Sequence, residues 1–382
     1  RWLLGVERPY SPKMYYATKV PFSSKVFQLA AEDIVSAIHA IAGATKKLIV
    51  VDLDNTLWGG VVGESGWEGI TLGGHDFKGE AFVDFQRALK SLERRGIQLG
   101  IVSKNDESVA MEAINKHPNM ILKENDFCGW RINWFDKAEN IRSLVEELNI
   151  GLDSVVFIDD NPAERQRVLT AFPEILVPDW PLDVTSYASS LKRLKCFDSA
   201  HFSEEDRLRT DMYRSQAQRV KLSKVQSSME EWLESLSTVL NVRRLTNANI
   251  KRVTQLFNKT NQLNMSTRRL SETELEDWAS IETNHVLTVS VSDSFGDLGL
   301  VGVLGFSLAD KSGVITDFVL SCRAMGREVE RTMFYCTVME LTKLGAEEIT
   351  ARYIPTERNR PTLDVFNDLK LVHDKNYQFE IP

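Results

Sequence analysis

Cysteine is scarce in this sequence, and its spacing carries no metal-binding pattern. The chain has 382 residues and four cysteines, Cys128, Cys196, Cys322 and Cys336, none of which forms a C-x-x-C pair. This usage argues against a disulfide framework and against a zinc site. It is typical of a protein of the reducing cytoplasm, where we expect this chain to reside.

Long apolar runs and concentrated basic stretches are also missing. No run of about 18 apolar residues occurs, so we predict no membrane-spanning segment and no membrane partner. The net charge is -8 and no stretch concentrates Lys and Arg, which argues against a nucleic-acid partner. A small phosphorylated ligand would therefore need a local cationic site or a metal. The chain begins at Arg1 without a signal segment, which is compatible with a piece of a longer polypeptide.

The length and apolar content predict a folded protein of two domains. A chain of 382 residues exceeds what one hydrophobic core usually serves, and 43% hydrophobic residues is ordinary for a globular protein. No internal repeat or low-complexity tract is evident. We divide the chain into a lead-in segment (1–45), an α/β domain (46–182), a helical linker (183–220) and a smaller α+β domain (221–382).

The first domain has the pattern of a Rossmann-like parallel sheet. Apolar runs rich in Val and Ile occur at 48–53, 97–103 and 154–159, as expected of strands buried on both faces. Residues 81–92 and 141–148 between them carry apolar side chains at helical spacing. The alternation of strand and helix predicts a parallel α/β fold.

The second domain has a different pattern. Residues 225–240 and 247–258 have helical character, and short strands are predicted at 286–293, 300–308 and 313–321. A further helix follows the glycine-containing loop after the last strand. Helices combined with an antiparallel type of sheet predict an α+β domain.

Polar clusters follow each of the three apolar strands of the first domain. They are Asp52-Leu-Asp54-Asn-Thr56, then Ser103-Lys104-Asn105-Asp106, then Asp159-Asp160-Asn161-Pro162, with Lys137 between the last two. The carboxyl ends of parallel strands meet at one edge of a sheet, where ligands bind. A single D-x-D after a strand is usually a solvated turn, but clusters after three strands predict a site.

The residue types in these clusters suit phosphoryl transfer. Asp52 is a candidate nucleophile that would form an aspartyl-phosphate, and Asp54 a candidate acid and base. Ser103 would hydrogen-bond a phosphate oxygen and Lys137 would contribute positive charge. Four carboxylates at one edge repel each other, so we expect them to bind Mg²⁺, a cation that prefers oxygen ligands. The predicted metal ligands are Asp52, Asp54, Asp159 and Asp160, and the predicted phosphate-binding residues are Thr56, Ser103, Lys104, Asn105, Lys137 and Arg323.

These motifs resemble those of FkbH-like proteins in subfamily IIIC of the haloacid dehalogenase superfamily. The matching stretches of the first half are VVDLDNTLWGGVVGE, VSKND, INWFDKAENI and VFIDDNPAER. In the second half they are QLFNKTNQLNMSTRRL, VSDSFGDLGLVGV and FVLSCRAMGREVE. The resemblance implies loading of the glyceryl unit of D-1,3-bisphosphoglycerate, with loss of phosphate, onto the phosphopantetheine thiol of an acyl carrier protein in polyketide biosynthesis. It also implies that the chain is a stand-alone enzyme or a domain of a larger polyketide synthase.

The second half resembles the acetyltransferase (GNAT-like) fold, which binds acyl-CoA by a loop after its fourth strand. Here that loop contains Arg323, Gly326 and Arg327. Glu328 stands where the pyrophosphate-binding pattern R-x-x-G-x-G/A has a small residue. Its charge would oppose a pyrophosphate, so the sequence favours a carrier-borne arm without one.

Cys322 is the candidate nucleophile for acyl transfer. It lies between a strand and a loop that opens a helix, with Arg323 and Arg327 nearby, a setting in which thiol pKa values fall. It would hold a glyceryl thioester before transfer to the carrier thiol. The competing interpretation is a small buried side chain, which is how we interpret the other three cysteines. Two further functions stay open: a small-molecule phosphatase without acyl transfer, and a non-catalytic domain that docks carrier proteins.

Overall fold

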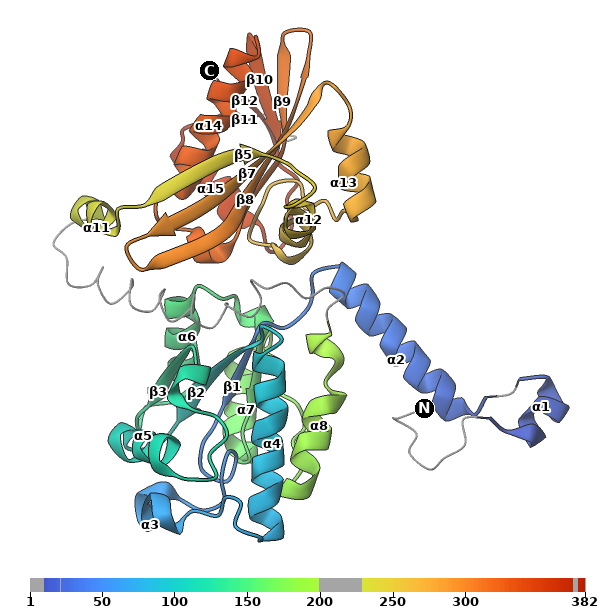
Figure 1. The fold of residues 1–382 in the computed structure, drawn as a ribbon, viewed down its shortest axis with the longest axis vertical. Helices are drawn as coiled ribbons and strands as arrows, with labels where there is room; N and C mark the ends of the chain where they lie inside the picture. Colours follow the sequence, from blue (N-terminus) through green and yellow to red (C-terminus); the bar gives the residue numbers. More distant parts are fainter. Residues whose placement is uncertain (1–9, 21, 199–228, 374–376, 382) are drawn as a thin grey trace.

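The computed structural model describes residues 10–20, 22–198, 229–373 and 377–381, and these contain two separate sheets (Figure 1). The fold class predicted from the sequence, a parallel α/β sheet followed by a second domain of sheet and helices, is confirmed, although the sheet of the second domain is the larger of the two. No described helix combines the length and the apolar character that crossing a membrane requires.

The sheet of the first half is parallel, with strand order β3-β2-β1-β4. Its strands are β1 (Leu48–Val51), β2 (Gln98–Ser103), β3 (Gly129–Ile132) and β4 (Val155–Ile158). The helices are α1 (Pro12–Thr18), α2 (Ser24–Ile41), α3 (Val62–Gly69), α4 (Phe77–Glu93), α5 (Glu107–Lys116), α6 (Lys137–Leu148), α7 (Pro162–Ala171) and α8 (Tyr187–Arg193). Short 3₁₀ turns lie at η2 (Glu124–Asp126), η3 (Leu152–Ser154), η4 (Val184–Ser186) and η5 (Lys195–Phe197).

Strand β1 lies at the centre of this half and is buried on both faces. Ile49 and Val51 pack into the apolar layer that includes residues of α4, α5 and α8. Leu48 and Val50 pack into the opposite layer, with residues of α6 and α7. Because successive side chains of a strand point to opposite faces, an unbroken apolar run serves both layers.

The sheet of the second half is mixed and larger, with strand order β11-β12-β10-β9-β8-β7-β5 and β6 paired to β9. Its strands are β5 (Val239–Arg244), β6 (Leu263–Asn264), β7 (Asn284–Asp293), β8 (Gly296–Ala309), β9 (Ser312–Leu320), β10 (Glu348–Arg352), β11 (Val372–His373) and β12 (Gln378–Ile381). The helices are α11 (Met229–Leu236), α12 (Ile250–Lys259), α13 (Glu272–Ala279), α14 (Val329–Lys343) and α15 (Arg360–Asp368), with the 3₁₀ turn η6 (Cys322–Ala324). Its strands pair antiparallel except for β9 and β10, which are parallel.

One predicted element of the second half is wrong in part. The helical pattern at 225–240 extends too far, because the described helix α11 ends at Leu236 and strand β5 begins at Val239. Strand β5 pairs along its whole length with β7, from Val239 to Arg244. This pairing with a strand distant in sequence overrides the local pattern. The predicted linker at 183–220 is described to residue 198, where α8 and η5 lie, and the rest of it lies outside the described residues.

Candidate active site

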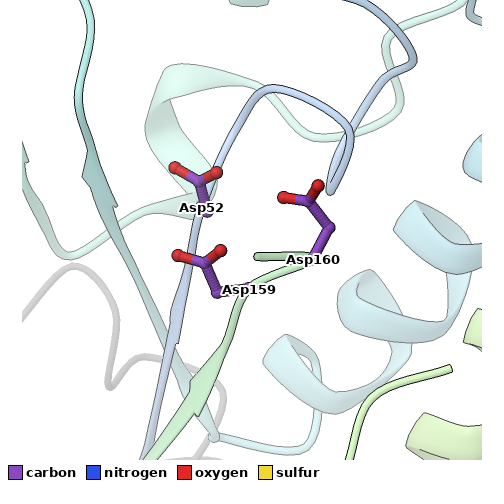
Figure 2. A group of neighbouring side chains, drawn as sticks. All are labelled: Asp52, Asp159 and Asp160. Atoms are coloured by element: carbon purple, nitrogen blue, oxygen red, sulfur yellow. The ribbon is translucent and has the colours of Figure 1, made fainter. Parts of the chain in front are cut away.

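Three aspartates meet at the carboxyl edge of the first sheet. Asp52 follows β1, and Asp159 and Asp160 follow β4, which pairs directly with β1 through Val51 and Ile158. Their carboxylate groups each offer an oxygen, and these oxygens lie within 4.8 Å of one another (Figure 2). Parallel pairing in register therefore brings together acids that are 107 residues apart or more.

Lys137 supplies a positive charge between two of these acids. Its Nζ lies 2.9 Å from Asp52 Oδ1 and 2.6 Å from Asp159 Oδ2, and the side chain is 5% exposed. Lys137 is the first residue of α6, whose N-cap Asp136 accepts hydrogen bonds from the amides of Ala138 and Glu139. The cap fixes where the helix begins and thereby where Lys137 enters the cluster.

The cluster contains more negative charge than Lys137 neutralises. Burial raises the pKa of Asp52, against the opposing effects of Lys137 and Ser103. Burial, followed by the charge of Asp52, raises the pKa of Asp159 to about 6. Burial and the charge of Asp159 raise the pKa of Asp160. Burial alone would lower the pKa of Lys137, but Asp52 and Asp159 outweigh it and raise this pKa. A proton or a further cation is therefore favoured here.

The carboxylate oxygens of the cluster are suitable ligands for Mg²⁺. Among the described residues no well-aligned donor reaches Asp52 Oδ1, although it is buried and Lys137 lies close to it. Asp52 is 6% exposed, Asp159 is fully buried, and Asp160 is partly accessible. Magnesium prefers oxygen ligands and binds through one or two carboxylates together with substrate phosphate and water. Asp52, Asp159 and Asp160 are the residues that would hold the ion.

Asp54 lies outside this group, although its sequence position led us to expect it among the metal ligands. Its Oδ1 accepts hydrogen bonds from Trp58 Nε1 at 2.8 Å and from the amide of Val62 at 3.0 Å. Its Oδ2 accepts one from Asn105 Nδ2 at 2.8 Å. These three donors orient the Asp54 carboxylate, which suits a positioned acid and base better than a metal ligand.

The predicted phosphate-binding residues of the first half have different surroundings. Ser103, at the end of β2, is 1% exposed and hydrogen-bonds Asp52. Thr56 Oγ1 accepts a hydrogen bond from the amide of Asp160 and lies 3.4 Å from its Oδ1. Lys104 instead forms an ion pair with Glu164 at 2.6 Å. Ser103 and Thr56 thus lie within the cluster, whereas Lys104 is engaged beside it.

Two residues that support the site were not singled out in the sequence. The Arg165 guanidinium donates to the backbone carbonyls of Asp159 and Asp160, at 2.8 Å each. Trp58 donates to Asp54. Both residues belong to stretches that carry the family resemblance. Arg165 contacts nearby backbone carbonyls, and Trp58 contacts a side chain four residues away. Spacing alone does not mark such supporting contacts.

Cys322 lies at the opposite edge of the first sheet from the aspartates. Its backbone carbonyl accepts a hydrogen bond from Asn149 Nδ2 at 2.6 Å, and Asn149 lies at the end of α6, before β4. Strand β1 spans the sheet between Lys47, on the Cys322 side, and Asp52. Five residue steps at about 3.3 Å each separate these two residues by roughly 16 Å. Cys322 and Asp52 therefore belong to two separate sites. The side chain of Arg323, a predicted phosphate ligand, lies outside the described part of the structure.

A cavity of about 650 Å³ lies between the two halves, and Cys322 is part of its wall. The first half contributes mainly residues that precede β1, β2 and β4, and the second half contributes residues of α12 and of the loops after α12, β9 and β10. Lys47 Nζ donates to the carbonyl of Lys259 at 3.2 Å, and Arg358 pairs with Asp153 at 3.2 Å. These contacts join the two halves around the cavity.

Neither a family model nor a curated protein matches this chain. Among solved structures, the N-terminal part of a Bacteroides fragilis protein, which contains a phosphatase domain and was crystallised with Mg, is 41% identical to it. That match covers 51% of this chain and 52% of the other, with a TM-score of 0.48, so the chain spans about half the length of that structure.

Solved acetyltransferases match a smaller part of the chain. Spermidine N-acetyltransferase from Vibrio cholerae, in complex with CoA and spermine, is 15% identical, covering 37% of this chain and 91% of its own, with a TM-score of 0.28. The ribosomal-protein-S18-alanine N-acetyltransferase from Escherichia coli is 7% identical, covering 37% and 89%, with a TM-score of 0.28.

Proposed function

We propose that the first half is a magnesium-dependent phosphatase of the haloacid dehalogenase type, with Asp52 as its nucleophile. The observation that carries this proposal is the meeting of Asp52, Asp159 and Asp160 around Lys137. Magnesium is also the ion with which the phosphatase-domain structure from Bacteroides fragilis was crystallised. When bound, it would neutralise charge on the transferring phosphoryl group.

The side chains of this site can carry out both steps of hydrolysis, formation of the aspartyl-phosphate and its breakdown by water. Asp52 attacks phosphorus, and the bond to the leaving oxygen breaks while Asp54 gives that oxygen a proton. Asp54 then takes a proton from water, which attacks the aspartyl-phosphate and restores the Asp52 carboxylate with release of inorganic phosphate. Ser103 and Lys137 hold equatorial oxygens of the phosphoryl group, which is where charge is spread during transfer.

We further propose that the substrate is D-1,3-bisphosphoglycerate and that the glyceryl group passes through Cys322 to the phosphopantetheine thiol of an acyl carrier protein. The sequence motifs in both halves support this proposal, as does the place of Cys322 in the wall of a cavity large enough for a small ligand. The Cys322 thiolate attacks the C1 carbonyl and expels phosphate, giving a thioester. The carrier thiolate then attacks that thioester and regenerates Cys322.

Because Cys322 and Asp52 are separated, we propose that each acts on a different phosphate of the substrate. Strand β1 lies between the two places, and its span of roughly 16 Å from Lys47 to Asp52 is too long for Asp52 and Cys322 to act on the same bound acyl phosphate. On this proposal Asp52 hydrolyses the C3 phosphate monoester, and Cys322 consumes the C1 acyl phosphate. The same separation favours a second candidate function, a phosphatase that acts on a small molecule and transfers no acyl group.

Intact-mass spectrometry distinguishes these functions. The protein is mixed with D-1,3-bisphosphoglycerate, Mg²⁺ and a holo carrier protein, and released phosphate is measured in parallel. The proposal predicts a glyceryl mass on the carrier, lost in Cys322→Ala but kept in the matched control Cys336→Ala, whose cysteine lies in α14. Phosphate release with no glyceryl mass on any protein would support only the phosphatase function. Carrier binding without phosphate release would leave a docking domain.

A further inference from the structure

The cavity between the two halves differs in charge from the rest of the molecule. Its wall contains six basic side chains and three acidic ones, whereas the whole chain has a net charge of -8. The basic residues come from both halves, which approach each other at this point. The basic side chains are Lys46, Lys47, Arg95, Arg252, Lys259 and Arg358.

Within the described part of the chain, the partners of two of these cations, Lys46 and Arg358, include only one carboxylate, that of Asp153. Lys46 Nζ donates to the backbone carbonyls of Asp153 and Glu174, at 2.5 and 3.4 Å. Arg358, from the second half, pairs with the Asp153 carboxylate at 3.2 Å, and its side chain is 47% exposed. Carbonyl oxygens carry no formal charge, so the single carboxylate of Asp153 serves both cations.

Burial and the nearby charge of Arg358 both lower the pKa values of basic side chains at the cavity. Burial, opposed by Asp153 and assisted by the charge of Arg358, lowers the pKa of Lys46. Burial and then Arg358 also lower the pKa of the neighbouring Arg269, whose guanidinium donates to Asn261 in the cavity wall. An anion placed among these groups would relieve the repulsion between them.

We propose that this cavity is a phosphate-binding site, separate from the aspartate cluster, which holds a phosphate-bearing ligand with its reacting group beside Cys322. The volume of about 650 Å³ lies in the range of small-molecule sites. Guanidinium and ammonium groups are the usual partners of phosphate. The identity of the ligand rests on the proposed function: the phosphate belongs either to the phosphoglyceryl donor or to the phosphopantetheine arm.

Binding to the full chain, measured by calorimetry with chelator present and without Mg²⁺, tests this site. The probes are 3-phosphoglycerate and 4′-phosphopantetheine, and the one that binds identifies the source of the phosphate. Arg358→Gln should weaken binding about tenfold through loss of a charge-assisted contact. Arg331→Gln is the matched control, because Arg331 is 53% exposed and pairs with Glu328 at 3.2 Å, yet lies outside the cavity wall. Equal affinities for the two variants, or no binding of either probe, would overturn the proposal.

A second measurement uses the unmodified chain and so avoids any effect of substitution on folding. Alkylation of Cys322 and Cys336 by iodoacetamide is followed by peptide mass spectrometry, with and without the probe that binds. The site predicts slower alkylation at Cys322 only, and an unchanged rate at Cys322 would contradict it. Asp52→Asn should bind the probe as the parent does. A protein that binds the probe but releases no phosphate would retain this site and lose the proposed phosphatase function.

Discussion

Replacing Lys137 by Met should make the stability of the first half depend on Mg²⁺ more strongly than the stability of the parent does. Lys137 is almost fully buried and lies within 3 Å of both Asp52 and Asp159. Met keeps an unbranched apolar stem of nearly the same length and removes the ammonium group. The variant therefore leaves three clustered carboxylates without the ammonium group that contacts two of them.

The expected cost follows from the burial of these groups. Removing one partner of a buried ion pair typically costs about 3–5 kcal/mol, because the remaining charge stays buried and uncompensated. A cation that binds the folded variant more tightly than the folded parent restores part of this loss. At a Mg²⁺ concentration 100 times its dissociation constant, the gain is about 2.7 kcal/mol.

The loss should also depend on pH, with a defined sign. The pKa of Asp159 is raised from 3.8 to about 6, so the folded protein binds this proton more tightly than the unfolded chain does. The raised pKa contributes stability, fully present below about pH 3.8 and lost as pH rises through about 6. That contribution is about 3 kcal/mol, from 1.36 kcal/mol per pH unit. At pH 5 Asp159 is mostly protonated, so Lys137→Met should cost less there than at pH 7.5.

Urea unfolding of the parent and variant, at both pH values and with or without Mg²⁺, measures these effects. Lys90→Met is the matched control, because Lys90 forms ion pairs with Glu93 and Asp126 in the same half, away from the cluster. We expect its loss to be smaller and independent of Mg²⁺. If Lys137→Met lost less than about 1 kcal/mol, or if Mg²⁺ stabilised both variants equally, the description of the cluster would be wrong.

Three further predictions concern the first half. Asp52→Asn should reduce phosphate release from a phosphate monoester at least a thousandfold, measured by a colorimetric phosphate assay, because an amide is a poor nucleophile; residual activity above a tenth would contradict this. Apparent Mg²⁺ affinity, measured by calorimetry, should fall as pH drops below about 6, since Mg²⁺ then competes with the proton on Asp159; a constant affinity from pH 5 to 8 would contradict this. Gly100→Ala should destabilise the protein by about 1–3 kcal/mol in urea unfolding, because the added Cβ would lie 2.9 Å from Leu144 Cδ2; an unchanged midpoint would show that Leu144 can move aside.

The strands that build the aspartate site could be predicted because their sequences agree with their surroundings. Residues 48–51 are apolar without interruption and are buried on both faces, and the acids that follow mark the carboxyl edge. Strand β3, with the sequence Gly-Trp-Arg-Ile, was not predicted. It lies at the edge of the sheet and is only partly buried, so its sequence has no long apolar run.

The places of Asp54 and Cys322 could not be predicted from the sequence. Asp54 accepts hydrogen bonds from Trp58, Val62 and Asn105, and these depend on the turn after β1. Cys322 is placed by the contact between the two halves, through Asn149. Sequence spacing indicates which residues follow strands, but not how one half of a chain packs on the other.

Trapping the phosphoenzyme would show directly whether Asp52 is the nucleophile. The protein is mixed with acetyl phosphate and Mg²⁺, quenched in acid within milliseconds, and digested for peptide mass spectrometry. We expect one phosphoryl group on the peptide that contains Asp52, absent when Mg²⁺ is chelated and absent in Asp52→Asn. A phosphoryl group on any other residue, or phosphate release at full rate by Asp52→Asn, would contradict it.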